Sequence, residues 1–80
     1  MIKYLMKDIK AKSGALRNVH VGILGRECTV AIFNNAVFNY VNREGMPMSV
    51  YTSFVLDVKQ DNKTLIIETV NTVYELEVIE

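Results

Sequence analysis

The chain has 80 residues, half of them apolar, and its nine basic and nine acidic residues cancel. A chain of this length holds one hydrophobic core, so we expect a single domain over residues 1–80. The balanced charge removes the simplest argument for a nucleic-acid or membrane ligand. No apolar run approaches the roughly 18 residues of a membrane span, and no signal peptide is indicated. Cys28 is the only cysteine, which favours a reducing, cytoplasmic compartment.

The charges are unevenly placed along the chain. Residues 1–26 carry six basic residues against one acidic residue, whereas residues 57–80 carry two basic residues against six acidic ones. One interpretation is that the two ends lie near each other and neutralise one another. The other is one basic face and one acidic face, used for head-to-tail contact or for a charged partner.

Apolar residues of the first dozen follow the i, i+3, i+4, i+7 spacing of a helix, at Ile2, Leu5, Met6 and Ile9. This spacing predicts a short helix within residues 1–12. Because Ile2, Tyr4 and Met6 also alternate, a strand is the alternative interpretation. Lys12-Ser13-Gly14 breaks either pattern.

From Leu16 onward the apolar period is two, which predicts strands. The alternation of Val19, Val21 and Ile23 predicts a first strand that returns through Gly25-Arg26-Glu27 into a second strand over 28–33. Asn34-Asn35 is expected to turn the chain into a third strand over 36–41.

Asn42-Arg43-Glu44-Gly45 and Pro47 predict a turn before the longest strand, over 48–58. Its length predicts a bend or bulge near Thr52-Ser53. One face of this strand is expected to carry Met48, Val50, Thr52, Phe54, Leu56 and Val58. Two further strands are predicted over 64–70 and 73–79. The fold predicted is mainly β, a small antiparallel SH3-like barrel or curled meander of five to six strands. A two-layer α+β arrangement is the alternative.

The segment from Thr52-Ser53 through Thr69-Val70-Asn71-Thr72-Val73-Tyr74-Glu75-Leu76 resembles the closing hairpin of small uncharacterised β-barrel proteins from bacteria and their phages. The resemblance covers about residues 50–79. It implies a compact β-domain and a phage or mobile-element origin, where many short proteins act by binding a host protein. It implies no activity and no catalytic residues.

The sequence is poor in groups that carry chemistry, so we expect no enzyme, no cofactor and no metal site. His20 and Cys28 would face each other across the predicted first hairpin, but two ligands make a poor metal site. Together with Glu27 they supply the residue types of a catalytic nucleophile, base and acid. Burial in an apolar strand, however, raises the pKa of a thiol and makes it unreactive. Glu75 and Glu77 share one face of the last strand, where alternating glutamates favour solubility.

A nucleic-acid-binding barrel is the alternative function, because small barrels combine basic side chains with stacking aromatic residues. The basic candidates are Lys3, Lys7, Lys10, Lys12, Arg17 and Arg26. The stacking candidates are Tyr4, Phe38, Tyr40 and Tyr51. Each aromatic residue is also a candidate for the core.

Protein binding is the function that the sequence favours. The segment around Arg43 is rich in the aromatic, methionine and arginine residues of interface hot spots, and its candidates are Phe38, Tyr40, Arg43, Met46 and Met48. A barrel of this size seats about fifteen to twenty large side chains, fewer than the sequence supplies. The surplus predicts an exposed apolar surface that a protein partner or a second copy, as in a homodimer, would cover.

Overall fold

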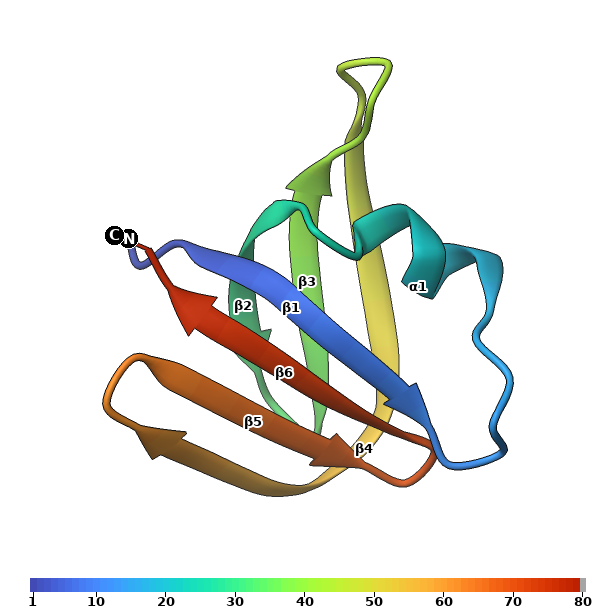
Figure 1. The fold of residues 1–80 in the computed structure, drawn as a ribbon, viewed down its shortest axis with the longest axis vertical. Helices are drawn as coiled ribbons and strands as arrows, with labels where there is room; N and C mark the ends of the chain where they lie inside the picture. The colour runs from blue at the N-terminus through green and yellow to red at the C-terminus, as the bar shows by residue number, and fades with distance from the viewer. Residues whose placement is uncertain (80) are drawn as a thin grey trace.

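The computed structural model describes residues 1–79, which form six strands and one short helix (Figure 1). In chain order the elements are β1 (Tyr4–Ala11), α1 (Asn18–Ile23), β2 (Glu27–Ile32), β3 (Asn35–Val41), β4 (Pro47–Asp61), β5 (Thr64–Thr69) and β6 (Thr72–Val78). The strands close into an antiparallel barrel. The prediction of a small, mainly β barrel is therefore confirmed, and the open two-layer alternative is wrong. The SH3-like character stays a prediction.

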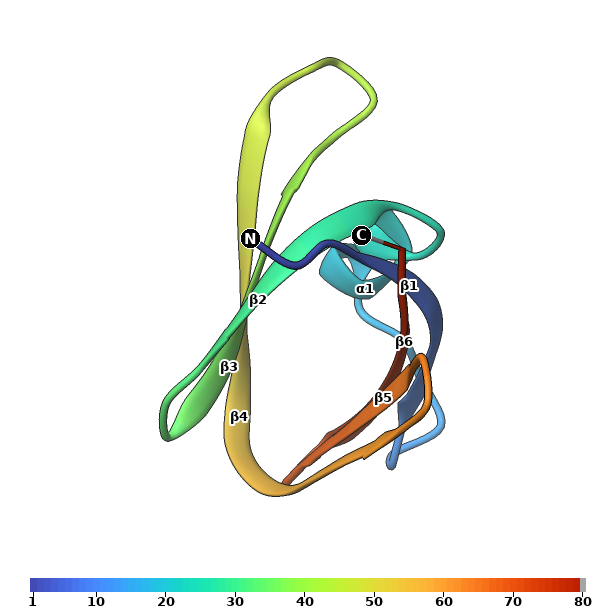
Figure 2. The same ribbon diagram turned by 90° about the vertical axis from the view of Figure 1, so that its left-hand side faces the viewer.

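The barrel closes in sequence order because β1 pairs with both β2 and β6. The pairing with β2 is short: Tyr4 faces Cys28 and Leu5 faces Glu27. β4 is shared between the two halves of the barrel, since its first part pairs with β3 and its second part with β5. Figure 2 shows β4 running straight beside β3 and then bending toward β5. Closure of this kind leaves few unpaired strand edges.

All six strands and α1 contribute to one core, which consists of Met6, Ile9, Ile23, Cys28, Ala36, Phe38, Tyr40, Val50, Leu65, Ile67, Tyr74 and Leu76. At its centre the rings of Phe38 and Tyr74 lie 4.9 Å apart between centroids. On β6 the residues alternate with a period of two at first, with Tyr74 and Leu76 buried and Glu75 exposed, while Glu77 and Val78 at its end are both half-buried.

The helix predicted within residues 1–12 is wrong, and the strand alternative is right. β1 contains a bulge at Lys7, which lies between the pairs Met6–Leu76 and Asp8–Glu75. One extra residue in a strand reverses the alternation beyond it. Met6 and Ile9 therefore both face the core although they are three residues apart. This bulge produces the helix-like spacing in the sequence.

The strand predicted from Leu16 is also wrong, because the residues whose alternation predicted it, Val19 to Ile23, lie in α1. His20 and Ile23, three residues apart on one side of the helix, are buried, while Val19 and Val21 are exposed. α1 covers the opening between β1 and the first half of β4 (Figure 1). The predicted first hairpin does not exist, since β2 pairs with β3 through a turn at Phe33 and Asn34.

The first and last strands lie side by side, with β1 and β6 paired along most of their length. Lys12 Nζ lies 2.7 Å from Glu68 Oε2, so a basic residue after β1 meets an acidic residue of β5. This arrangement agrees with the interpretation in which the two ends of the chain neutralise one another. Among residues 1–79, no helix has the length and apolar character needed to cross a membrane.

Candidate functional site

A bulge in β4 decides which of its side chains face outward. Thr52 and Ser53 together stand opposite Ala36 of β3, as the predicted bulge requires. The Thr52 side chain fixes this geometry, since its Oγ1 accepts the Ala36 N–H at 2.9 Å and donates to the Ser53 carbonyl at 2.8 Å. Because the extra residue reverses the alternation, Thr52 is buried whereas Phe54 is exposed.

A second bulge follows at Leu56, which lies between the pairs Val55–Thr69 and Asp57–Glu68. Leu56 is 59% exposed. The single face predicted for alternate residues of 48–58 is therefore wrong beyond Thr52. The two bulges direct Phe54 and Leu56 away from the core that the sequence pattern assigned to them.

Phe54 and Leu56 join neighbouring side chains in what we call the apolar face, which consists of Phe33, Val37, Tyr51, Phe54, Leu56 and Val70. Val37 pairs with Tyr51 across β3 and β4. The Phe54 carbonyl accepts the Val70 N–H at 2.9 Å. Phe33, Val37 and Tyr51 line a shared shallow hollow. The turn between β2 and β3 and the bend of β4, which carry these side chains, lie toward the same end of the molecule (Figure 2).

The three aromatic side chains of the apolar face are largely in solvent: Phe33 is 79%, Tyr51 74% and Phe54 61% exposed. A buried aromatic side chain removes roughly 150–250 Å² from water, so these three expose on the order of 400 Å². The largest apolar patch on a typical monomer is about 300–600 Å², and such a patch is often functional. None of the six residues of the apolar face is charged.

Two of the predicted interface residues lie in the core. Phe38 is fully buried against Tyr74, and Tyr40 is 8% exposed. The Tyr40 hydroxyl lies against α1, 3.2 Å from the place that a Cβ on Gly22 would occupy. Their predicted role in an interface is wrong, because both side chains point into the barrel from β3.

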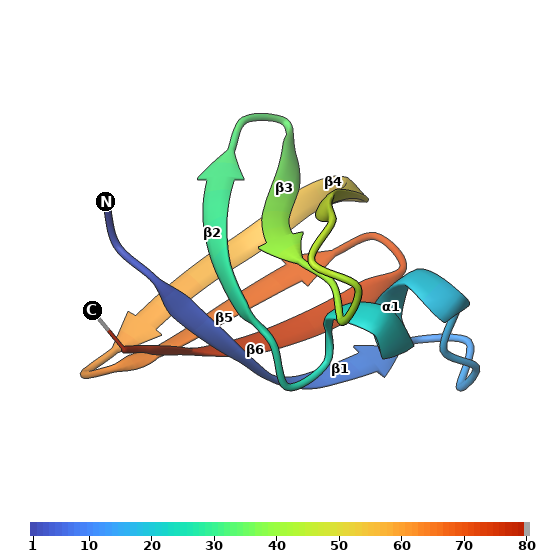
Figure 3. The same ribbon diagram turned by 90° about the horizontal axis from the view of Figure 1, so that it is seen from above.

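The other three predicted interface residues lie on the hairpin between β3 and β4, which projects from the end opposite the apolar face (Figure 1). Arg43 and Met48 line a groove of about 460 Å³ together with Val21 of α1 and Leu24, the residue that follows α1. Figure 3 shows the hairpin turn beside α1. Met46 is 59% exposed. This hairpin groove is a second apolar surface, but it exposes no aromatic ring to the extent that the apolar face does.

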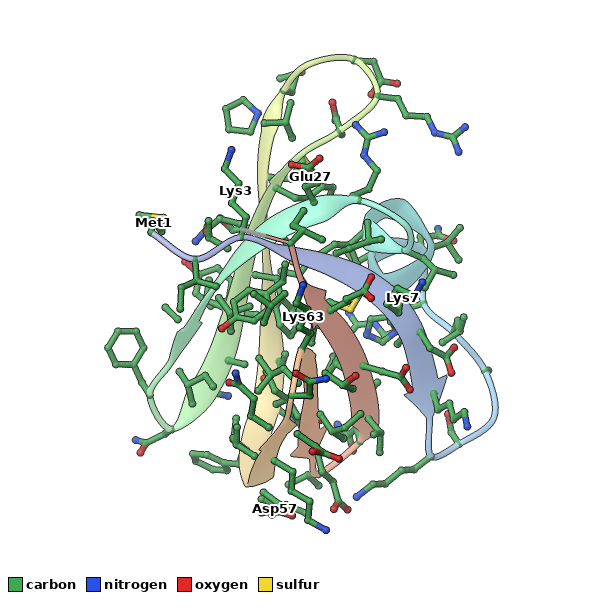
Figure 4. The ribbon with its side chains drawn as sticks, turned by 60° about the vertical axis from the view of Figure 1, so that its left-hand side comes forward. Met1, Lys3, Lys7, Glu27, Asp57 and Lys63 are labelled. Atoms are coloured by element: carbon green, nitrogen blue, oxygen red, sulfur yellow. The ribbon has the colours of Figure 1, made fainter. Side chains whose placement is uncertain are left out.

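The six basic residues predicted for a nucleic-acid surface are distributed over different elements, with Lys3 before β1, Lys7 and Lys10 on β1, Lys12 after β1, Arg17 before α1 and Arg26 after α1. Lys12 contacts Glu68, and Arg26 Nη2 donates to the Val41 carbonyl at 2.8 Å. In Figure 4, Lys3, Lys7 and Lys63 are spread across the view and do not form one cluster. Of the stacking candidates, Tyr51 is exposed and Tyr4 packs against the core.

The predicted approach of His20 to Cys28 across a hairpin is wrong, because His20 lies on α1 and contacts the Tyr74 hydroxyl at 3.3 Å. Burial raises the pKa of Cys28 to about 11, which keeps the thiol protonated. Glu27 begins β2 with its side chain exposed, and Glu75 and Glu77 lie on β6. In the described part of the chain, no three His, Cys, Asp or Glu side chains gather as they would around a metal ion.

Comparison of the chain with protein-family models, curated protein sequences and solved structures gave no match. The fold and the site define the class of protein as a small closed β-barrel that carries an exposed apolar face at one end.

Proposed function

We propose that this chain is a small protein-binding module that binds the surface of another protein chain through its apolar face. The observation that supports this is the exposure of Phe33, Tyr51 and Phe54, two of which follow from backbone irregularities in β4 and in the turn after β2. Aromatic residues are enriched at the centres of interfaces and charged residues are depleted there. The apolar face has both properties.

The composition of the apolar face favours a protein over a nucleic acid. Binding of single-stranded nucleic acid combines stacking rings with basic side chains that follow the phosphates. The apolar face has rings without a lysine or arginine among its members. Of the predicted stacking residues, Phe38 and Tyr40 are buried, so they offer no surface to a base.

The first partner that we propose is a second copy of the chain. A stable interface buries about 800 Å² on each side, and the three rings supply on the order of half of that area. Two uncharged faces meet without electrostatic repulsion, which suits a symmetric homodimer. We also propose that the chain is a regulator encoded by a phage or mobile element, which the resemblance of residues 50–79 supports. A cytoplasmic location is supported by the single cysteine.

Light scattering across a concentration series tests this proposal. We expect the mass to rise above 9.1 kDa toward twice that value as the concentration increases. The triple variant Phe33→Ser, Tyr51→Ser, Phe54→Ser should stay monomeric and keep the circular dichroism spectrum of the wild-type protein. The matched control is Met46→Ser with Met48→Ser on the hairpin between β3 and β4, which should associate like the wild-type protein.

Two results would contradict the proposal. A wild-type protein that stays monomeric at every concentration overturns the homodimer. Salt-sensitive, micromolar binding of a labelled single-stranded oligonucleotide that the triple variant loses would assign the apolar face to nucleic acid instead.

A further inference from the structure

A second hollow, polar in character, lies where α1 covers the barrel. This α1 pocket has a volume of about 260 Å³ and lies between the connection from β1 to α1, the bulge of β4 and the turn between β5 and β6. Ligand pockets in proteins commonly measure about 300–1,000 Å³, so the α1 pocket suits a small ligand.

The base of the α1 pocket is a buried hydrogen-bonded pair. His20 and Tyr74 are 5% and 2% exposed. The backbone N–H of Arg17 donates to His20 Nδ1 at 3.4 Å, so the neutral ring carries its proton on Nε2 and donates it to the Tyr74 hydroxyl at 3.3 Å. Burial raises the pKa of Tyr74, which keeps its hydroxyl protonated. The floor of the pocket, which the His20 and Tyr74 side chains form, is therefore uncharged and fixed in orientation.

The walls of the α1 pocket carry positive charge and no negative charge. Lys12 and Arg17 line it, and no lining residue in the described part of the chain is acidic. Lys12 is neutralised by Glu68, whereas the described ion pairs do not involve Arg17. Arg17 lines the pocket together with His20 and Tyr74, and its positive charge acts to lower the pKa of both groups.

The walls also supply a neutral donor. The Ser53 hydroxyl oxygen accepts the Asn71 N–H at 3.2 Å, so the hydroxyl hydrogen is left to donate. Ser53, Asn71 and Arg17 all line the α1 pocket. An arginine and a hydroxyl donor that line one pocket without a carboxylate are suited to an oxyanion.

We propose that the α1 pocket binds a small phosphate-bearing ligand, with the Arg17 guanidinium as its charged partner and the Ser53 hydroxyl as a neutral donor. The ligand is inorganic phosphate or the phosphate group of a small metabolite. The Tyr51 ring, which lines the same pocket and also belongs to the apolar face, offers a surface for the organic part of a metabolite in the monomer.

Proton NMR of His20 tests the proposal, because it is the only histidine of the chain and lies at the base of the pocket. Inorganic phosphate and adenosine monophosphate are titrated separately, with sodium chloride holding the ionic strength constant. We expect a saturable shift of the imidazole signals. We also expect a higher pKa of His20 with ligand bound, because the added negative charge stabilises the imidazolium among Arg17, Tyr74 and the Lys12–Glu68 pair.

Arg17→Gln should weaken binding about tenfold or more, as expected for loss of a charge-assisted pair. Ser53→Ala, which leaves the cation in place, should weaken it less. Lys7→Gln is the matched control, because it removes one positive charge from β1 outside the pocket and should leave binding unchanged. Tighter binding of adenosine monophosphate assigns the site to a metabolite, and equal binding assigns it to inorganic phosphate. Shifts that never saturate, or that are the same in Arg17→Gln, would overturn the proposal.

Discussion

The aromatic side chains of this barrel divide between two regions of opposite environment. Phe38 and Tyr74 fill the interior, while Phe33 and Phe54 stand in solvent at one end. The rings are similar in size and apolar character, so hydrophobicity does not separate them. Backbone register does: Phe38 lies in an unbroken stretch of pairing between β2 and β4, whereas Phe54 follows a bulge that reverses the alternation.

The two regions differ in what they offer to a partner. The interior rings have already lost their contact with water, so they stabilise the fold and nothing else. The rings of the apolar face keep on the order of 400 Å² in water, which corresponds to about 10 kcal/mol of transfer free energy before the entropic losses of association. This difference means that the same substitution should act on folding in one region and on association in the other.

The largest expected effect is that of Phe38→Ala. Removal of a fully buried ring that packs against Tyr74 should reduce the free energy of unfolding by about 3–5 kcal/mol. Denaturant unfolding followed by circular dichroism measures it, with Phe38→Leu as the milder variant that fills part of the cavity. A loss of less than about 1 kcal/mol would contradict the division between the two regions.

The next effect concerns the bulge that separates the regions. Thr52→Val removes the acceptor of the buried Ala36 N–H and should reduce the free energy of unfolding by about 1–3 kcal/mol. Thr52→Ser keeps the hydroxyl and should lose less. If the valine variant were as stable as the wild-type protein, the Thr52 hydroxyl would not be what holds the bulge, and the outward direction of Phe54 would need another cause.

The strands from β3 onward were predictable from the sequence because two signals agree there. Asn42 to Gly45 form a turn, and the Asn42 side chain accepts the backbone N–H groups of Glu44 and Met46. Between such turns the apolar residues alternate with a period of two. The strands predicted over 36–41, 48–58 and 64–70 correspond to β3, β4 and β5 with small differences at their ends.

The N-terminal third was not predictable in the same way, because its patterns are ambiguous. The bulge at Lys7 gives β1 the spacing of a helix, and α1 is only six residues long, too short for a helical period to outweigh the alternation of Val19, Val21 and Ile23. What fixes α1 is tertiary: His20 and Ile23 complete the core beside Tyr74.

The sequence predicted an exposed apolar surface but not the residues that form it. The sequence indicated surplus apolar residues and a bulge near Thr52-Ser53, and both predictions are consistent with the exposed rings. It placed Phe54 on the inner face because the alternation was counted through the bulge without the reversal. If the alternation of inward and outward side chains is reversed after the bulge at Thr52-Ser53, Phe54 is expected to point outward. The sequence therefore contained the information needed to place Phe54.

A smaller effect is expected from the pH dependence of the interior. Burial lowers the pKa of His20 below its ordinary value of 6.5, and the charge of Arg17 lowers it further. Above pH 6.5 the imidazole is neutral in the folded and the unfolded chain and adds no pH dependence. Below it the unfolded chain takes up the proton first, so the free energy of unfolding falls as the pH drops toward the folded-state pKa. His20→Gln should flatten this fall in denaturant unfolding measured across that range, and an unchanged slope would show that other groups cause it.

The smallest effect on stability is expected where the effect on association is largest. Phe54→Ser should change the free energy of unfolding by no more than about 0.5 kcal/mol, because a ring that is 61% exposed in the folded chain gains little from folding. Phe38→Ser makes the same chemical change in the interior and should unfold the protein. Denaturant unfolding of both variants, run beside light scattering of Phe54→Ser, separates the two roles. A loss above about 1 kcal/mol for Phe54→Ser would mean that the ring supports the bend of β4. The exposure of Phe54 would then be a consequence of its role in folding, and it would no longer support the apolar face as a binding surface.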